Sequence, residues 1–241
     1  MSSAEVFVSA QFPKAWLSVE LKGFRDHPEE YRTYSPFAFD SLPPIPEKQF
    51  DGTFSWLTIN ARESEHGTVF DRLYPSVLLL LEQQAENLGV AVPKPFSAFI
   101  TNPALPSSIR SMTHCGFGLA NRIVPVPWAE GCLLRFMADS QGCLFWYLFL
   151  AKHGEHCVVV ANKYCGGDPT SDREFMEKHL GPDWDREDPP NQTDKIWYCA
   201  PSFESFVYRL WIENEIWYAL KEDGRPTTQE QNEYLQHYKP S

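Results

Sequence analysis

The sequence predicts an α+β domain with a central antiparallel sheet and helices packed around it. Three short apolar runs lie close together between residues 131 and 161, and long helical patterns lie on either side of them. Strands grouped in this way, rather than alternating with helices, are typical of α+β folds. The chain has 241 residues, of which 43% are hydrophobic and 22% charged, so it can bury one large core.

The segment 131–161, GCLLRFMADSQGCLFWYLFLAKHGEHCVVVA, predicts an antiparallel meander. Its apolar runs cover 132–138, 143–151 and 157–161, and only short polar turns separate them. A parallel connection would need a dozen or more intervening residues, so neighbouring strands are expected to be antiparallel. Both sets of alternating side chains in the middle run are apolar, which predicts a central strand covered on both faces. The sets are Leu144, Trp146, Leu148 and Leu150, and Phe145, Tyr147 and Phe149.

Helical patterns flank the meander. Residues 74–88 combine Pro75 in the first turn with a helix-forming interior and a Gly89 stop. Residues 202–222 carry apolar side chains at three- and four-residue spacing, which predicts one wide stripe buried against the sheet. The expected stripe consists of Phe203, Phe206, Val207, Leu210, Trp217 and Leu220.

Polar residues and caps refine this prediction. Glu213 falls inside the stripe, where its carboxylate is expected to accept hydrogen bonds from backbone or arginine. A helix near 229–238 is expected behind a capping box at Thr227 and Glu230, and another helix before Gly181. Residues 90–103 are expected to be extended. A short helix near 104–112 and a strand near 196–200 complete the prediction.

Residues 1–67 are expected to form an N-terminal extension with short strands, either separate from the domain at 68–241 or part of it. Strand-like pieces begin near Glu5, Ala15 and Phe54. The Pro-rich stretch SPFAFDSLPPIPEK, at 35–48, excludes a helix or a central strand and predicts a surface connection.

Charge and composition exclude several classes of protein. The net charge of −11 opposes binding to nucleic acid and would attract a cationic protein instead. No apolar run is long enough to span a membrane, and the first residues lack the pattern of a secretory signal, so we expect a cytoplasmic protein with no membrane partner. The six cysteines include no CxxC pair and are expected to be buried thiols.

The motifs of common active sites are missing from the sequence. It contains no phosphate-binding loop, no GxSxG and no HExxH. His153 and Glu155 have the H-x-E spacing of zinc deaminases, but no PCxxC completes the metal site. Cys115 beside His114 has no evident orienting acid. We therefore expect no catalytic residue, no metal and no cofactor.

One loop has the composition of a protein-binding site. Residues 181–194 place acidic side chains around a tryptophan, a mixture that could hold a partner rich in Lys or Arg. The alternative is a solvated loop whose tryptophan packs onto the body of the protein. The candidate partner-binding residues are Asp183, Trp184, Asp185, Glu187 and Asp188.

The meander, with PFSAFITNPALPSSIR before it and SFESFVYRLWIENEIWYAL after it, resembles the SUKH superfamily. That superfamily includes bacterial toxin-immunity proteins and yeast cell-wall-synthesis regulators, and the resemblance covers about 74–222. A glycine begins the strand before the turn, and Asp139, Gly142 and Trp146 match the motif as turn and core positions. Glu213 and Trp217 are interpreted as structural positions of the last long helix.

The resemblance implies a non-enzymatic protein that binds other proteins. The expected function is an immunity protein that neutralises a basic toxin of nuclease or deaminase type by direct contact. A small-ligand-binding or hydrolytic domain with an aromatic-lined pocket near Trp146 and Trp217 is the alternative, and a module of a larger assembly is a third. The partner's identity, the oligomeric state and the choice between immunity and regulatory protein stay open.

Overall fold

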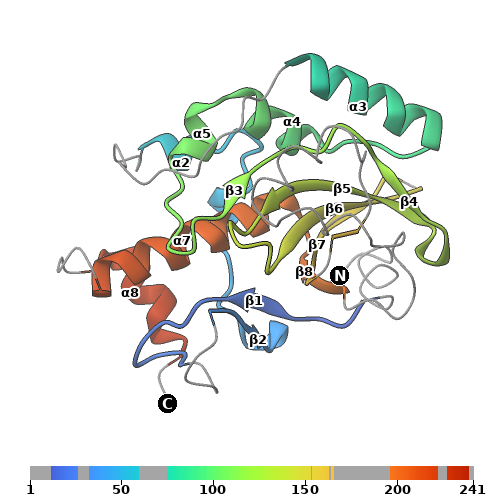
Figure 1. Ribbon diagram of the computed structural model, residues 1–241. Helices are drawn as coiled ribbons and strands as arrows, with labels where there is room; N and C mark the ends of the chain where they lie inside the picture. The colour runs from blue at the N-terminus through green and yellow to red at the C-terminus, as the bar shows by residue number, and fades with distance from the viewer. Residues whose placement is uncertain are drawn as a thin grey trace.

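The predicted α+β class is confirmed. The computed structural model describes residues 12–26, 33–59, 75–152, 154–162, 164–165, 196–221 and 227–238. Within these ranges a six-stranded antiparallel sheet forms the centre, with helices packed around it (Figure 1).

The predicted meander is confirmed as the middle of this sheet. Strands β5 (Gly131–Ala138), β6 (Phe145–Ala151), β7 (His156–Ala161) and β8 (Ile196–Ala200) are antiparallel neighbours in chain order. The short strands β3 (Gly116–Phe117) and β4 (Val124–Val126) both pair with the outer side of β5.

Strand β6 is buried along its whole length, as the two-sided apolar pattern predicts. Trp146 and Leu148 face a hydrophobic cluster that also contains side chains from the helices. Tyr147 and Phe149 face a second hydrophobic cluster on the other side of the sheet. A β-bulge in β5 interrupts the alternation of side chains between the two faces, so that Phe136 and Met137 both face the helices.

Gly131, which begins β5, is required by close packing. A Cβ atom at this position would lie 2.4 Å from the Phe149 ring and 2.7 Å from the Leu150 carbonyl oxygen. The glycine allows the two strands to approach each other.

Helix α7 (Phe203–Lys221) packs against the sheet, and α8 (Gln229–Gln236) follows it. The predicted stripe on α7 is wrong at Leu220, which is exposed. Leu210 and Trp217 are only partly buried, and Leu210 packs against the core cluster. Burial instead extends around most of the helix, because α7 is enclosed by more than the sheet. The buried polar side chains are Ser205, Arg209, Glu213 and Asn214.

The capping box of α8 lies one residue later than predicted. Thr228 accepts a hydrogen bond from the Gln231 N–H, and the Gln231 side chain accepts one from the Thr228 N–H. Glutamine fills the reciprocal position as well as glutamate does, which moves the helix start from Thr227 to Thr228.

Two segments predicted to be extended are helical. Residues 90–103 contain α4 (Lys94–Thr101). The short helix predicted near 104–112 follows it as α5 (Ala104–Ser107). The prolines near Lys94 lie at the start of α4, where a missing N–H costs little. The strand expected at Phe54 is α2 (Ser55–Ile59), whose start is capped by Asp51.

Most buried apolar residues described before residue 60 belong to the same hydrophobic cluster as α7, whereas Phe12 belongs to the cluster on the other face of the sheet. Members of the cluster shared with α7 include Trp16, Leu21, Phe54 and Leu57. Strand β1 (Trp16–Ser18) pairs with β2 (Ser35–Phe37) in a separate two-stranded sheet.

Short 3-10 turns complete the described structure: η1 (Phe39–Ser41), η2 (Glu47–Gln49) and η3 (Pro127–Ala129). The domain boundary expected at residue 67, the strand expected near Glu5 and the helix expected before Gly181 lie outside the described residues. None of the helices in the described ranges has the length and apolar character needed to cross a membrane.

Candidate interaction surface

Helix α3 (Pro75–Leu88) lies at the edge of the molecule (Figure 1). Some of its apolar side chains are exposed. It contains four consecutive leucines, of which Leu78 and Leu81 are buried. Leu79 and Leu80 are 67% and 47% exposed. Four adjacent leucines subtend more than one face of a helix, so burial of two of them leaves the others in solvent.

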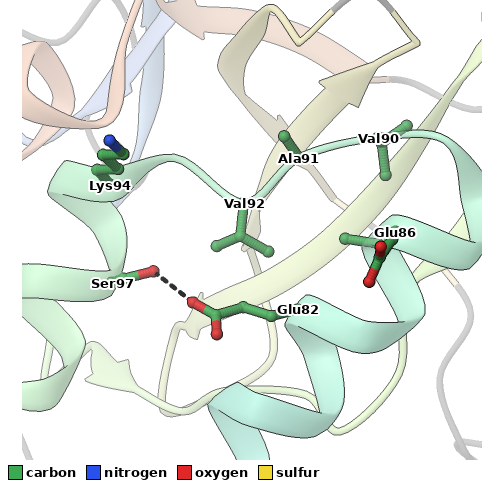
Figure 2. Close-up of a pocket in the computed structure, with 8 residues that line it drawn as sticks. Glu82, Glu86, Val90, Ala91, Val92, Lys94 and Ser97 are labelled. Atoms are coloured by element: carbon green, nitrogen blue, oxygen red, sulfur yellow. Dashed lines mark hydrogen bonds between the residues drawn. The ribbon is translucent and has the colours of Figure 1, made fainter.

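A groove of about 510 Å³ lies between α3 and α4 (Figure 2). Its floor is apolar, and its rim carries carboxylates from α3 and a lysine from the start of α4. The lining residues are Glu82, Ala85, Glu86, Val90, Ala91, Val92, Lys94 and Ser97.

The groove follows from the way α3 ends and α4 begins. Gly89 adopts φ 70°, and the Val90 N–H donates to the Ala85 carbonyl at 2.9 Å, which closes the last turn of α3. Pro93 has an extended conformation before α4. The short connection between them supplies the floor, and the two helices supply the walls.

The carboxylates of the rim have few partners. Ser97 Oγ donates to Glu82 Oε1 at 3.3 Å, from the facing wall. Within the part of the chain that the structure describes, neither Glu82 nor Glu86 forms an ion pair. Lys94 stands on the α4 side of the groove. The surface therefore offers negative charge beside exposed leucine and an apolar floor, a combination that also occurs in protein interfaces.

No family model matches the chain, and the comparisons with curated proteins and with solved structures also gave no match.

The partner-binding residues predicted from the sequence, Asp183, Trp184, Asp185, Glu187 and Asp188, lie outside the described residues. They stay a prediction.

Asp139 and Gly142 form the turn between β5 and β6. Asp139 Oδ1 accepts from the Gln141 N–H at 2.9 Å and the Cys143 N–H at 3.2 Å. Gly142 adopts φ 71°, a left-handed conformation that favours glycine, and its N–H donates to the Asp139 carbonyl. Tyr34 donates to Asp139 Oδ2 at 2.7 Å, which ties the turn to the N-terminal residues.

The two tryptophans of the alternative pocket differ in burial. Trp146 is 3% exposed, and its ring packs against Tyr34 and Phe206. Trp217 is partly buried on α7, with Tyr218 at its edge and the Lys221 ammonium near its ring. Neither tryptophan lines the groove between α3 and α4.

Glu213 is held by a group of donors inside the protein. Arg25 donates to both carboxylate oxygens, at 2.6 and 2.7 Å, and Trp16, Ser18 and Tyr234 add further hydrogen bonds. Burial alone would raise the pKa of Glu213, but Arg25 and the other donors lower it below the ordinary value. The arrangement is that of a structural ion pair.

Cys115 is a poor nucleophile at neutral pH. Burial raises the pKa of its thiol to about 11, although Thr113 and Tyr34 lie within hydrogen-bonding distance of the sulfur. His114 is exposed. Among the described residues there is no group of three His, Cys, Asp or Glu side chains that could hold a metal, and His153 lies outside them.

The sequence predicted helix α3 but not the surface it builds. The run of leucines at 78–81 was the available signal, because two of the four had to face solvent. The position of Lys94 and Ser97 across from Glu82 could not be predicted, since the helix that carries them was itself expected to be extended.

Proposed function

We propose that this chain is a non-enzymatic protein-binding module of SUKH type, an immunity protein that neutralises a cationic toxin by direct contact. The observation that carries the proposal is the α3 surface, where exposed leucine lies beside carboxylates with no ion pair among the described residues. Protein interfaces combine such apolar anchors with complementary charge.

The fold class agrees with what the resemblance implies. The resemblance rests on the meander, and two of its features have physical reasons here: Gly131 permits close strand approach, and Gly142 permits a left-handed turn. These features support a SUKH-type scaffold. A cytoplasmic location is part of the proposal, in keeping with six cysteines that are all free thiols.

The mechanism that fits is steric. An interface of about 1,600 Å² in total would cover the active site of a small toxin domain. The net charge of −11 would attract a basic partner and speed association. Association should therefore slow as salt concentration rises, and an association rate that is independent of salt would exclude electrostatic attraction.

A small-ligand or hydrolytic domain remains the second candidate. The groove volume of about 510 Å³ falls in the range of ligand pockets, roughly 300–1,000 Å³. The aromatic pocket expected at Trp146 is less favoured, because that side chain is buried against other rings.

The test is whether the protein protects cells against a toxin domain that is encoded next to the protein's own gene. Cells that express the toxin domain should survive when the full chain is co-expressed, and the purified proteins should form a stable complex. If the neighbouring gene encodes such a domain and the cells die equally with and without the chain, the proposal is wrong. If the neighbouring genes encode metabolic enzymes, the second candidate gains support.

A further inference from the structure

We infer that the groove between α3 and α4, together with Leu79, is the docking site for a segment of the partner that carries both basic and apolar side chains. This inference rests on the proposed function and names the surface that performs it. The occupant is a short segment with lysine or arginine facing α3 and an apolar side chain on the groove floor.

The exposed side of α3 has the right geometry for such a segment. Leu79, Glu82 and Glu86 follow one another at spacings of three and four residues, so they lie on one face of the helix. All three are exposed, Leu79 by 67%. An apolar anchor and two carboxylates therefore point away from the core along one line.

The charges favour a cationic occupant. Glu82 and Glu86 are four positions apart on α3, where like charges repel each other. No described cation forms an ion pair with either one, and the hydrogen bond from Ser97 leaves the charge of Glu82 unneutralised. A lysine or arginine from a partner would relieve this repulsion.

The groove floor supplies the apolar half of the site. Ala85 and Val90 are buried beneath it, and Val92 is half-buried and projects into the space between the helices (Figure 2). A volume of about 510 Å³ accommodates side chains from a short segment. Lys94 stands on the α4 side and would repel basic residues there, which directs the cationic side chains of the occupant toward α3.

The test uses the full chain labelled with ¹⁵N and a defined probe, a twelve-residue peptide that alternates pairs of lysine with leucine. Addition of the peptide should shift amide resonances of residues 79–97. The variant Glu82→Gln/Glu86→Gln should bind it about five- to tenfold more weakly, as expected for the loss of two exposed ion pairs. Leu79→Ser should also weaken binding.

The matched control is Asp40→Asn/Glu47→Gln, which also removes two negative charges, but from exposed sites in η1 and η2. It should bind the peptide as the unmodified protein does. Equal weakening in both double variants would show that only net charge matters and would overturn the inference. Shifts centred outside 79–97 would overturn it as well. All variants change exposed side chains, and their melting temperatures establish that they fold.

A second measurement separates this inference from the proposed function. If the groove variants still protect cells from the toxin as the unmodified chain does, the immunity role stands and the docking site lies elsewhere. If the unmodified chain fails to protect cells but the peptide still binds at 79–97 with the expected charge dependence, the docking site is supported and the immunity role is wrong.

Discussion

Glu213 in α7 forms a bidentate ion pair with Arg25, a residue 188 positions earlier in the chain. The side chains of Arg25 and Glu213 are 6% and 1% exposed. Trp16 and Tyr234 donate to the same carboxylate, so β1, α7 and α8 meet at one buried group. The ion pair therefore connects the N-terminal residues to the two last helices.

Replacing Glu213 by glutamine should destabilise the protein strongly. Glutamine has nearly the same shape but carries no charge, which leaves Arg25 as a buried cation without its partner. Removing one member of a buried ion pair typically costs about 3–5 kcal/mol. Denaturant unfolding of the purified variant measures the loss. Asp40→Asn, at an exposed position, serves as the control and should change the free energy of unfolding by less than about 0.5 kcal/mol.

The contribution of Glu213 to the free energy of unfolding should disappear in acid. Its pKa is lowered in the folded protein, because Arg25 and the other donors outweigh the effect of burial. The stabilisation is therefore complete above the ordinary glutamate pKa of about 4.3 and is lost as pH falls through the lower folded-state value.

Unfolding free energies of the unmodified protein and of Glu213→Gln, measured from pH 7 to pH 2, test this sign. The difference between the two should be largest at pH 7 and should shrink below about pH 4. Other carboxylates titrate in both proteins and cancel in the difference. A difference that stays constant to pH 2 would mean that the charge of Glu213 is not what stabilises the fold.

The parts of this fold that follow from local patterns could be predicted, and the parts that depend on distant contacts could not. Alternation along 143–151 was sufficient to identify a central strand covered on both faces. The sequence suggested that Glu213 meets an arginine, but nothing local identifies Arg25. Helix α4 was missed because its prolines lie in the first turn, where they do not oppose a helix. The groove depends on that helix and was missed with it.

Gly131→Ala should destabilise the sheet. The added methyl group would overlap the Phe149 ring and the Leu150 carbonyl, so β5 and β6 would have to separate or the ring would have to move. Such overpacking costs roughly 1–3 kcal/mol. Thermal unfolding measures the effect. Gly118→Ala is the control, since its nearest contact would be an ordinary 3.7 Å from the end of the Arg135 side chain. Equal losses in the two variants would contradict the steric explanation.

The start of α8 can be assigned by a pair of substitutions. Thr228→Ala removes the hydroxyl that accepts from the Gln231 N–H and should cost about 1 kcal/mol. Thr227→Ala removes a side chain whose hydroxyl donates to Asn232 at an exposed site, and should cost less. Urea unfolding distinguishes the two. A larger loss in Thr227→Ala would place the cap where the sequence pattern first suggested it.

Neighbouring leucines of α3 should differ sharply in their contribution to stability. Leu81 is fully buried, so Leu81→Ala should cost roughly 2–5 kcal/mol through lost burial and the cavity it leaves. Leu79 is 67% exposed, so Leu79→Ala should change the free energy of unfolding by less than about 0.5 kcal/mol. Denaturant unfolding of both variants at low protein concentration measures the contrast.

A large loss in Leu79→Ala would mean that this side chain is covered in solution. Repeating the measurement over a hundredfold range of protein concentration would then identify the cover, because stabilisation by a second copy of the chain depends on concentration. If Leu79 instead contributes little to stability at every concentration, its exposed methyl groups are free to contact a partner. In that case the weaker peptide binding expected for Leu79→Ser can be attributed to the surface and not to a disturbed fold.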